Sequence, residues 1–218
     1  RLAGVVRQLP LPDQPPGYGL GHALYITTQN NVFRGNRVHD NGEYGFHVYA
    51  AYPARQTANN IIEGNFIYKN GLNTTRYGHV CCGGIVLASG SGNVAYNNLV
   101  YNHPARGIDV LATGTNVKVY NNTFYNNGSD IVAASGGSGY IQNNIAYPRG
   151  ASIASGYSTS NNLTTDPLFV NPATGDFTLQ LSSPAIDKGV LLSEVTVDIR
   201  NNPRPRQLGQ DIGAYEVQ

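Results

Sequence analysis

Apolar and polar residues alternate with a period of two in several short stretches of the chain. These stretches are Gly45 to Ala50, Gly84 to Ala88 and Gly107 to Ala112, with fainter copies at Leu24 to Ile26, Ile131 to Ala133 and Ile153. A period of two is typical of strands, because successive side chains of a strand point to opposite faces. No stretch shows the apolar stripe of a helix, so the chain is predicted to be all-β.

A second pattern lies between these stretches. It consists of an apolar residue, two residues, Asn, one residue, an apolar residue, one residue and a large polar aromatic side chain. It occurs at 33–39, 62–68, 95–101, 119–125 and 141–147, with a weaker copy around Asn162. A unit of about 20 to 30 residues cannot bury its apolar face alone, so such units stack into a solenoid. With strands only, the solenoid is a parallel β-helix, here of about seven coils.

The chain divides into three parts. Residues 1–20 are rich in proline, which interrupts strand pairing, and are expected to form an irregular linker or cap. Residues 21–165 form the coils of the β-helix. Residues 166–218 form a terminal coil and a C-terminal cap, and 211–217 is expected to close the lower edge, because an open solenoid end is an aggregation template.

Stacked coils align equivalent residues into columns. One inward column is predicted to hold Phe46, Ile85, Ile108, Ile131 and Ile153, and another Val38, Ile67, Val100, Phe124 and Ala146. Asn tolerates left-handed backbone, and its amide can bond the copies above and below, so a ladder is predicted from Asn36, Asn65, Asn98, Asn122, Asn144 and Asn162. A row beside it, expected to be covered by the C-terminal tail, comprises His39, Tyr68, Tyr101, Tyr125 and Tyr147.

The run Asn31 to Ala50 and its copies resemble the right-handed parallel β-helix repeat of secreted pectate-lyase-like proteins. The tail segments 166–169, 183–187 and 211–216 are similar to the closing segment of many bacterial secreted β-helix proteins. This resemblance implies a secreted or cell-surface bacterial protein that acts on or binds a polysaccharide. It is specific for the fold and weak for function, because such folds host lyases, hydrolases, epimerases and non-catalytic binders.

Charge and composition narrow the function classes. The formal net charge is +1 and only 12% of the residues are charged, so neither a nucleic-acid footprint nor a membrane-surface patch is indicated. There is no long apolar span that would predict a transmembrane segment. The chain starts at Arg1 and has no methionine, so we expect it to be a processed or excised piece of a longer protein.

The only cysteines, Cys81 and Cys82, are adjacent. Two interpretations stay open: a pair of small buried thiols, or a disulfide between neighbouring residues. Neighbouring Cα atoms lie about 3.8 Å apart, below the usual disulfide range, and an exported protein favours oxidation.

Two insertions, 51–58 and 72–80, border the Gly-apolar strands at neighbouring coils, and loops on a rigid scaffold often carry binding. The outward residues of these strands would be the floor of a trough: Tyr25, His47, Val86 and Asp109, with Thr27, Tyr49, Ala88 and Leu111 beside them. The walls would bring Tyr52, Arg55, Arg76, Tyr77, His79 and the cysteines. An elongated trough with aromatic and hydrogen-bonding side chains suits a polysaccharide.

The sequence gives weaker evidence for a catalytic site than for a binding site. If the chain is an enzyme, the candidates for catalytic residues are Asp109, His47, His79 and Arg76. A glycosidase needs two carboxyl groups, and only Asp109 is expected on the floor. A uronate lyase needs a base and cations, often calcium held by several acids. The floor lacks an acidic cluster, which is the main departure from pectate lyases, so no cofactor is expected, with calcium left as an open alternative.

The preferred prediction is therefore a non-catalytic carbohydrate-binding module for a plant cell-wall polysaccharide, with xylan favoured. Its binding residues would be Tyr25, His47, Tyr49, Tyr52, Arg76, Tyr77, His79 and Asp109. In profile, though not in motif, the chain is similar to the β-helix type of carbohydrate-binding module of plant-xylan-degrading enzymes. This resemblance in profile implies that the longer protein is a multidomain carbohydrate-active enzyme. The alternative is a β-helix lyase or glycoside hydrolase acting on pectin, alginate or hemicellulose, and an adhesin-like surface repeat is a smaller third one.

Overall fold

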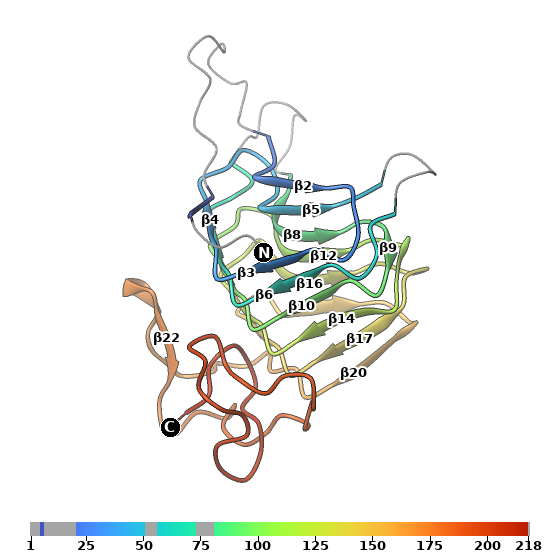
Figure 1. Ribbon diagram of the computed structural model, residues 1–218. Coiled ribbons are helices and arrows are strands. Elements are labelled where there is room, and N and C mark those ends of the chain that lie inside the picture. Colours follow the sequence, from blue (N-terminus) through green and yellow to red (C-terminus); the bar gives the residue numbers. More distant parts are fainter. Residues whose placement is uncertain (1–4, 7–20, 51–55, 73–80, 218) are drawn as a thin grey trace.

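The computed structural model describes residues 5–6, 21–50, 56–72 and 81–217. Three six-stranded parallel sheets run the length of the molecule, and each coil contributes one strand to each sheet (Figure 1). In the described residues, the short 3₁₀ helix Pro172–Thr174 is the one helix, and none is long and apolar enough to cross a membrane. The predicted all-β parallel β-helix is confirmed.

We name the three sheets A, B and C; along the chain, each coil passes through sheet C, then sheet A, then sheet B. Sheet C contains β2 (Leu24–Ile26), β5 (Phe46–Val48), β8 (Gly83–Leu87), β12 (Arg106–Val110), β16 (Ser129–Ala133) and β19 (Ala151–Ile153). Sheet A contains β3 (Val32–Arg34), β6 (Ile61–Glu63), β10 (Val94–Tyr96), β14 (Val117–Tyr120), β17 (Gly139–Gln142) and β20 (Tyr157–Ser160). Sheet B contains β1 (Val5–Val6), β4 (Arg37–His39), β7 (Phe66–Tyr68), β11 (Leu99–Tyr101), β15 (Thr123–Tyr125) and β18 (Ile145–Tyr147).

Smaller pairings complete the fold. Strands β9 (Gly90–Ser91) and β13 (Gly114–Thr115) pair in parallel, and β21 (Phe169–Asn171) pairs antiparallel with β22 (Asp176–Leu179). Strand β1 pairs in parallel with β4, so two residues of the segment expected to be irregular extend sheet B. The prolines of that segment all lie after Val6, so they do not interrupt this pairing.

The interior columns follow the predicted register with one exception. Val38, Ile67, Val100, Phe124 and Ala146 align strand by strand, and so do Phe46, Ile85, Ile108 and Ile131. Ile153 is displaced by two positions: it pairs with Ala133, and Ala151 pairs with Ile131. The shift keeps Ile153 on the inward face, because two residues restore the same side of a strand.

The asparagine ladder is confirmed. Each amide donates to the Oδ1 atom of the next asparagine at 2.8 to 3.0 Å, from Asn36 down to Asn162. The left-handed residue, however, is the one before each ladder asparagine, namely Gly35, Gly64, Asn97, Asn121, Asn143 and Asn161. The preceding residue makes the turn, and the ladder residue then points its side chain inward.

The sequence-based prediction missed two further ladders. One joins Asn31, Asn60 and Asn93 through amide bonds of 2.8 and 3.0 Å. The other descends through Asn41, Asn70, His103, Asn127 and Asp130, and it includes a histidine in the place of an asparagine. Three buried ladders therefore satisfy polar backbone groups at the corners of the coils.

The C-terminal tail lies along the outer face of sheet B. Phe169, Phe177 and Leu179 form an apolar cluster with Leu99 and Ile145, and Tyr101, Tyr125 and Tyr147 pack against it. The Tyr101 and Phe177 ring centroids are 4.9 Å apart, so the tail covers the Tyr101, Tyr125 and Tyr147 part of the row as expected. The segment 211–217 does not close the lower edge: Gly213 donates to the Asn143 carbonyl, and Ala214 donates to Thr123 on the side of the coils.

Candidate functional site

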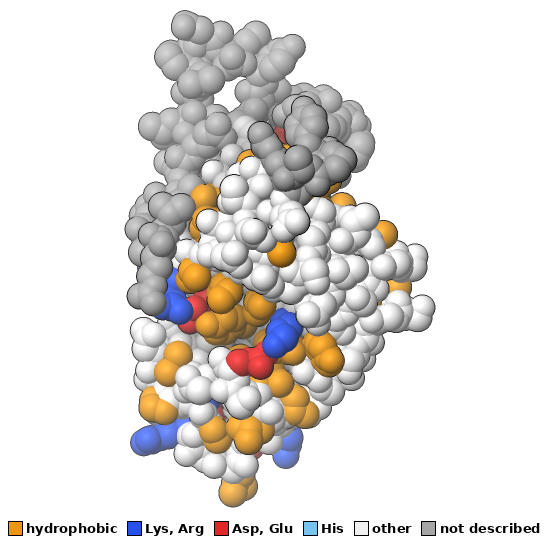
Figure 2. Space-filling view, turned by 45° about the vertical axis from the view of Figure 1, so that its right-hand side comes forward, with side chains coloured by type: hydrophobic (Ala, Val, Ile, Leu, Met, Phe, Trp, Pro, Cys, Tyr) orange, Lys and Arg blue, Asp and Glu red, His pale blue; other side chains and the backbone are white. Residues whose placement is uncertain are grey.

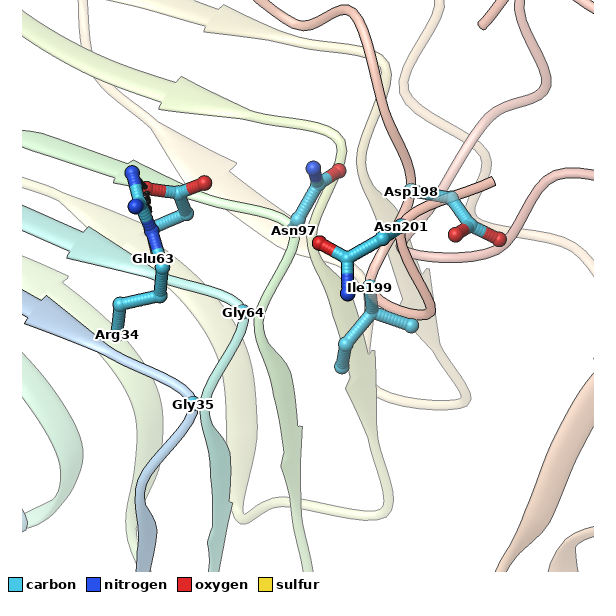
Figure 3. A pocket seen from close by; sticks show the side chains of 8 residues that line it. All are labelled: Arg34, Gly35, Glu63, Gly64, Asn97, Asp198, Ile199 and Asn201. Atoms are coloured by element: carbon cyan, nitrogen blue, oxygen red, sulfur yellow. Dashed lines mark hydrogen bonds and ion pairs between the residues drawn. The ribbon is translucent and has the colours of Figure 1, made fainter. Parts of the chain in front are cut away.

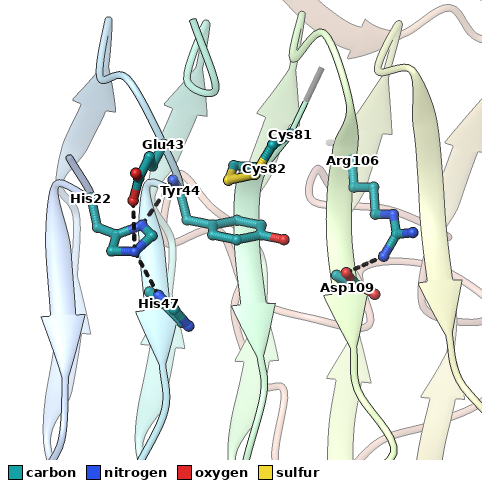
Figure 4. The surroundings of a disulfide bond; sticks show 8 residues. All are labelled: His22, Glu43, Tyr44, His47, Cys81, Cys82, Arg106 and Asp109. Atoms are coloured by element: carbon teal, nitrogen blue, oxygen red, sulfur yellow. Dashed lines mark hydrogen bonds and ion pairs between the residues drawn. A yellow bond between two sulfur atoms is a disulfide. The ribbon is translucent and has the colours of Figure 1, made fainter. Parts of the chain in front are cut away.

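The outer face of sheet C aligns the floor residues in the expected order. Tyr25 pairs with His47, His47 with Val86, and Val86 with Asp109, so these four form one column across β2, β5, β8 and β12. Figure 4 shows this face, with histidines at one end and an arginine–aspartate pair at the other. The two ends of the column differ in exposure and chemistry.

Aromatic side chains gather at the upper end of the column. The His47 ring lies 4.8 Å from the Tyr25 ring, edge to face, and 5.6 Å from the Tyr49 ring, stacked. Tyr25 is 48% exposed and Tyr49 is 36% exposed, whereas most aromatic rings of the coils are covered. The two tyrosines thus present apolar faces and polar edges to solvent on either side of His47. We name Tyr25, His47 and Tyr49 the aromatic platform.

His22 fixes the platform from the turn before β2. Its Nε2 atom lies 2.9 Å from Glu43 Oε2 and 2.8 Å from His47 Nδ1, and the Tyr44 amide donates to its Nδ1 at 3.2 Å. Because Nδ1 accepts this bond, the proton of the neutral ring resides on Nε2. Burial, and next the proximity of His22, lower the pKa of His47 to about 4, against the opposing effect of Glu43. His47 is therefore a neutral imidazole at neutral pH.

The side chains at the lower end of the column are buried and do not reach solvent. Val86 is 1% and Asp109 is 2% exposed, so they do not form the open floor that alternation predicted. Arg106 Nη1 donates to Asp109 Oδ2, while Asp109 Oδ1 is buried with no partner among the described residues. Burial raises the pKa of Asp109, and Arg106 partly offsets this effect. Strand alternation gives the direction of a side chain but not what lies over it.

A disulfide joins Cys81 and Cys82 directly before β8. It lies between the histidine group and the Arg106–Asp109 pair, and the Tyr44 ring extends toward it (Figure 4). Cys82 has a positive φ of 73°, and the backbone of this pair closes around Gly71, where a Cβ atom would come within 2.9 Å of the Cys81 carbonyl oxygen. The pair is thus a tight backbone feature at the middle of the face.

Several predicted site residues, Tyr52, Arg55, Arg76, Tyr77 and His79, lie outside the described residues. Among the residues that are described, no three His, Cys, Asp or Glu side chains group together as metal ligands. His22 and Tyr44 were missed as site residues because they precede their strands, where the period-two pattern gives no direction. Arg106 was missed because it is the first residue of β12 and lies before the alternating stretch that begins at Gly107.

The comparisons with known proteins agree with this architecture. A family model described as "Right handed beta helix region" matches residues 18–169. The chain belongs to the right-handed β-helix family. The crystal structure of pectate lyase Pel9A is similar to this β-helix chain, with a TM-score of 0.63 and 20% sequence identity over 86% of the chain. The chain spans about half, 51%, of that lyase, so the similarity concerns the fold. No curated protein sequence matches the chain.

Proposed function

We propose that this β-helix is a non-catalytic carbohydrate-binding module that recognises a neutral plant cell-wall polysaccharide, xylan first, on the upper outer face of sheet C. The observation that carries the proposal is the aromatic platform, in which Tyr25 and Tyr49 remain exposed on either side of His47. A module of this kind would be secreted or displayed on a bacterial surface and joined to a catalytic domain. The upstream coding sequence tests that connection.

Ring geometry explains why a neutral sugar chain suits this face. A sugar ring has an apolar face and a polar rim, and a tyrosine offers the same combination. Contacts of aromatic rings contribute about 0.5 to 1.5 kcal/mol each beyond burial. The neutral His47 ring adds a surface without net charge, because its pKa is near 4. Both exposed tyrosine rings contact the His47 ring and are thereby preorganised, which reduces the entropy lost on binding.

Affinity gel electrophoresis in xylan tests the proposal. The wild-type chain should be retarded, and Tyr25→Ala and Tyr49→Ala should each weaken apparent binding about 2- to 10-fold. Tyr140→Ala is the matched control, because Tyr140 is 42% exposed but lies on sheet A. Equal retardation of all three variants and the wild type would refute the platform.

A second candidate is a polysaccharide lyase or glycoside hydrolase, and one observation favours it. Two neighbouring histidines, His22 and His47, lie beside the Glu43 carboxylate, and Arg106 lies on the same sheet face, so this face holds groups that acid–base catalysis uses. The histidine pair would then carry the proton transfer, and Arg106 or the undescribed Arg76 and His79 would contact a uronate. Release of reducing ends or unsaturated products from xylan, pectin or alginate, lost in Asp109→Asn or His47→Ala, would replace the binding proposal.

A further inference from the structure

A pocket lies at the seam between sheet A and the C-terminal tail, on a different face from the aromatic platform. Two adjoining cavities of about 380 Å³ and about 280 Å³ share Arg34, Glu63 and Asn201 among their lining residues. Figure 3 shows Arg34 and Glu63 on the coil side and Ile199 and Asn201 on the tail side. In Figure 2, charged side chains of both signs lie beside a band of hydrophobic ones. We name this site the seam pocket.

The pocket exists because one corner of the coil changes from asparagine to glycine. In the lower coils this left-handed corner holds Asn97, Asn121, Asn143 and Asn161, and each amide donates to a tail carbonyl. In the two upper coils the same corner holds Gly35 and Gly64, where an added Cβ atom would meet nothing within 4 Å. Among the described residues, the bonds between this corner and the tail carbonyls therefore end at Asn97, and the space above it is open.

The coil-side wall offers hydrogen-bonding groups with little net charge. Arg34 donates from Nε to Glu63 Oε2 at 2.7 Å, and its Nη2 lies 2.5 Å from the same oxygen. The Arg34 side chain remains 45% exposed and keeps further N–H groups, whereas Glu63 is 11% exposed. Asn97 is 1% exposed and donates to the Val197 carbonyl, and its Oδ1 atom has no partner among the described residues.

The tail-side wall is a rigid turn. Asp198 accepts from the backbone amides of Arg200 and Asn202 at 2.8 Å and from the Glu216 amide at 3.1 Å. Lys118 Nζ, on sheet A, donates to Glu194 Oε1 at 2.7 Å and ties the same segment to the coils. Internal hydrogen bonds thus hold both walls in place, and small-molecule sites of about 300 to 1,000 Å³ are usually preformed in this way.

We propose that the seam pocket binds one neutral sugar unit, as a free sugar or as a side group of a branched polysaccharide. A hydroxyl-rich ligand can accept from the Arg34 guanidinium, donate to Glu63 and place an apolar face on Ile199. An anion is disfavoured, because Arg34 is already paired and the carboxylates of Glu63 and Asp198 line the same cavity. A cation is disfavoured by the Arg34 charge.

NMR titration of the ¹⁵N-labelled chain with xylose, arabinose, glucose and galactose tests the proposal, with glucuronate as the anionic comparison. A neutral sugar should shift the amide signals of Gly35, Gly64 and Asn97 with a Kd of about 1 to 10 mM. Gly64→Asn should weaken this binding at least about tenfold, because it fills the pocket with the residue that the lower coils carry at that corner. Gly150→Asn is the matched control, since Gly150 has a φ of 71° and open space but lies elsewhere.

The outcomes separate this site from the aromatic platform. Tyr25→Ala should leave the seam-pocket shifts unchanged, so failure of one site leaves the other intact. If Gly64→Asn does not fold, Glu63→Gln with the same titration replaces it. If a branched xylan, but not an unbranched one, displaces the free sugar from the pocket in the same titration, the ligand is a side group of a polysaccharide. If neither xylan displaces it, the ligand is a free sugar. Absence of shifts at about 50 mM of every neutral sugar, or equal binding of glucuronate, would overturn the proposal.

Discussion

His103 should make this β-helix sensitive to acid. It replaces an asparagine in the third ladder, where its Nδ1 accepts from the Asn70 amide at 3.0 Å and its own amide donates to Asn127 at 3.1 Å. The side chain is buried, and Nε2 has no hydrogen-bond partner among the described residues. Burial lowers the pKa of His103 to about 4, although the carbonyls of Asn70 and Ile67 favour the charged ring.

The sign of the effect follows from the two pKa values. The unfolded chain takes up a proton near pH 6.5, whereas folded His103 does so only near pH 4, so the unfolded state binds more protons between these values. Stability is therefore greatest above pH 6.5 and falls as the pH is lowered. Between pH 7 and pH 5 this residue costs the fold about 2 kcal/mol, and the loss is complete near pH 4 at about 3 kcal/mol.

The substitution His103→Asn removes this titration and restores the ladder chemistry. Urea unfolding at pH 7 and pH 5, followed by circular dichroism, gives the free energy of unfolding of both proteins. The wild type should lose about 2 kcal/mol more than the variant between the two pH values. His47 and the carboxylates contribute equally to both proteins and cancel in this comparison. An identical loss in both would refute a depressed pKa at His103.

Two other predictions follow from the ladder and the disulfide. Asn98→Leu should destabilise the fold by at least about 3 kcal/mol in urea unfolding, because it leaves buried partners in Asn65, Ile62 and Asn122 without their bonds, whereas Asn162→Leu at the more accessible end should cost less. The oxidised chain should be about two hydrogens lighter than the reduced one, and no thiol of Cys81 or Cys82 should titrate before reduction, so two reactive thiols would contradict the bond.

Sequence patterns predicted the interior of the solenoid because its contacts repeat. A ladder bond joins identical residues at one corner, so the repeated asparagines Asn65 and Asn98 can be recognised as partners from the sequence alone. The third ladder was missed because His103 breaks the repetition of asparagine, although its ring nitrogen accepts the same amide bond. Ile153 was placed two residues out because the chain advances only from 147 to 151 between the partners of Tyr125 and Ile131, two residues fewer than from 125 to 131.

The candidate sites were only partly predictable. Alternation placed Tyr25 and His47 side by side, because parallel pairing preserves the period of two. It could not place His22, which belongs to a turn, or show that Asp109 is covered. The seam pocket was not visible in the sequence, since its tail wall meets the coils through contacts such as Asn97 to Val197, 100 residues apart.

The choice between glycine and asparagine at one corner determines how far the tail covers the solenoid. Both residues accept the left-handed backbone, so the coil is the same whether the corner is Gly64 or Asn97. The asparagine adds an amide that bonds the tail, and the glycine leaves that position open. The choice between these two residues thus sets the coverage while the left-handed corner of the coil stays the same. A β-helix can therefore gain or lose a ligand site at this seam by single substitutions, while the aromatic platform on sheet C stays unchanged.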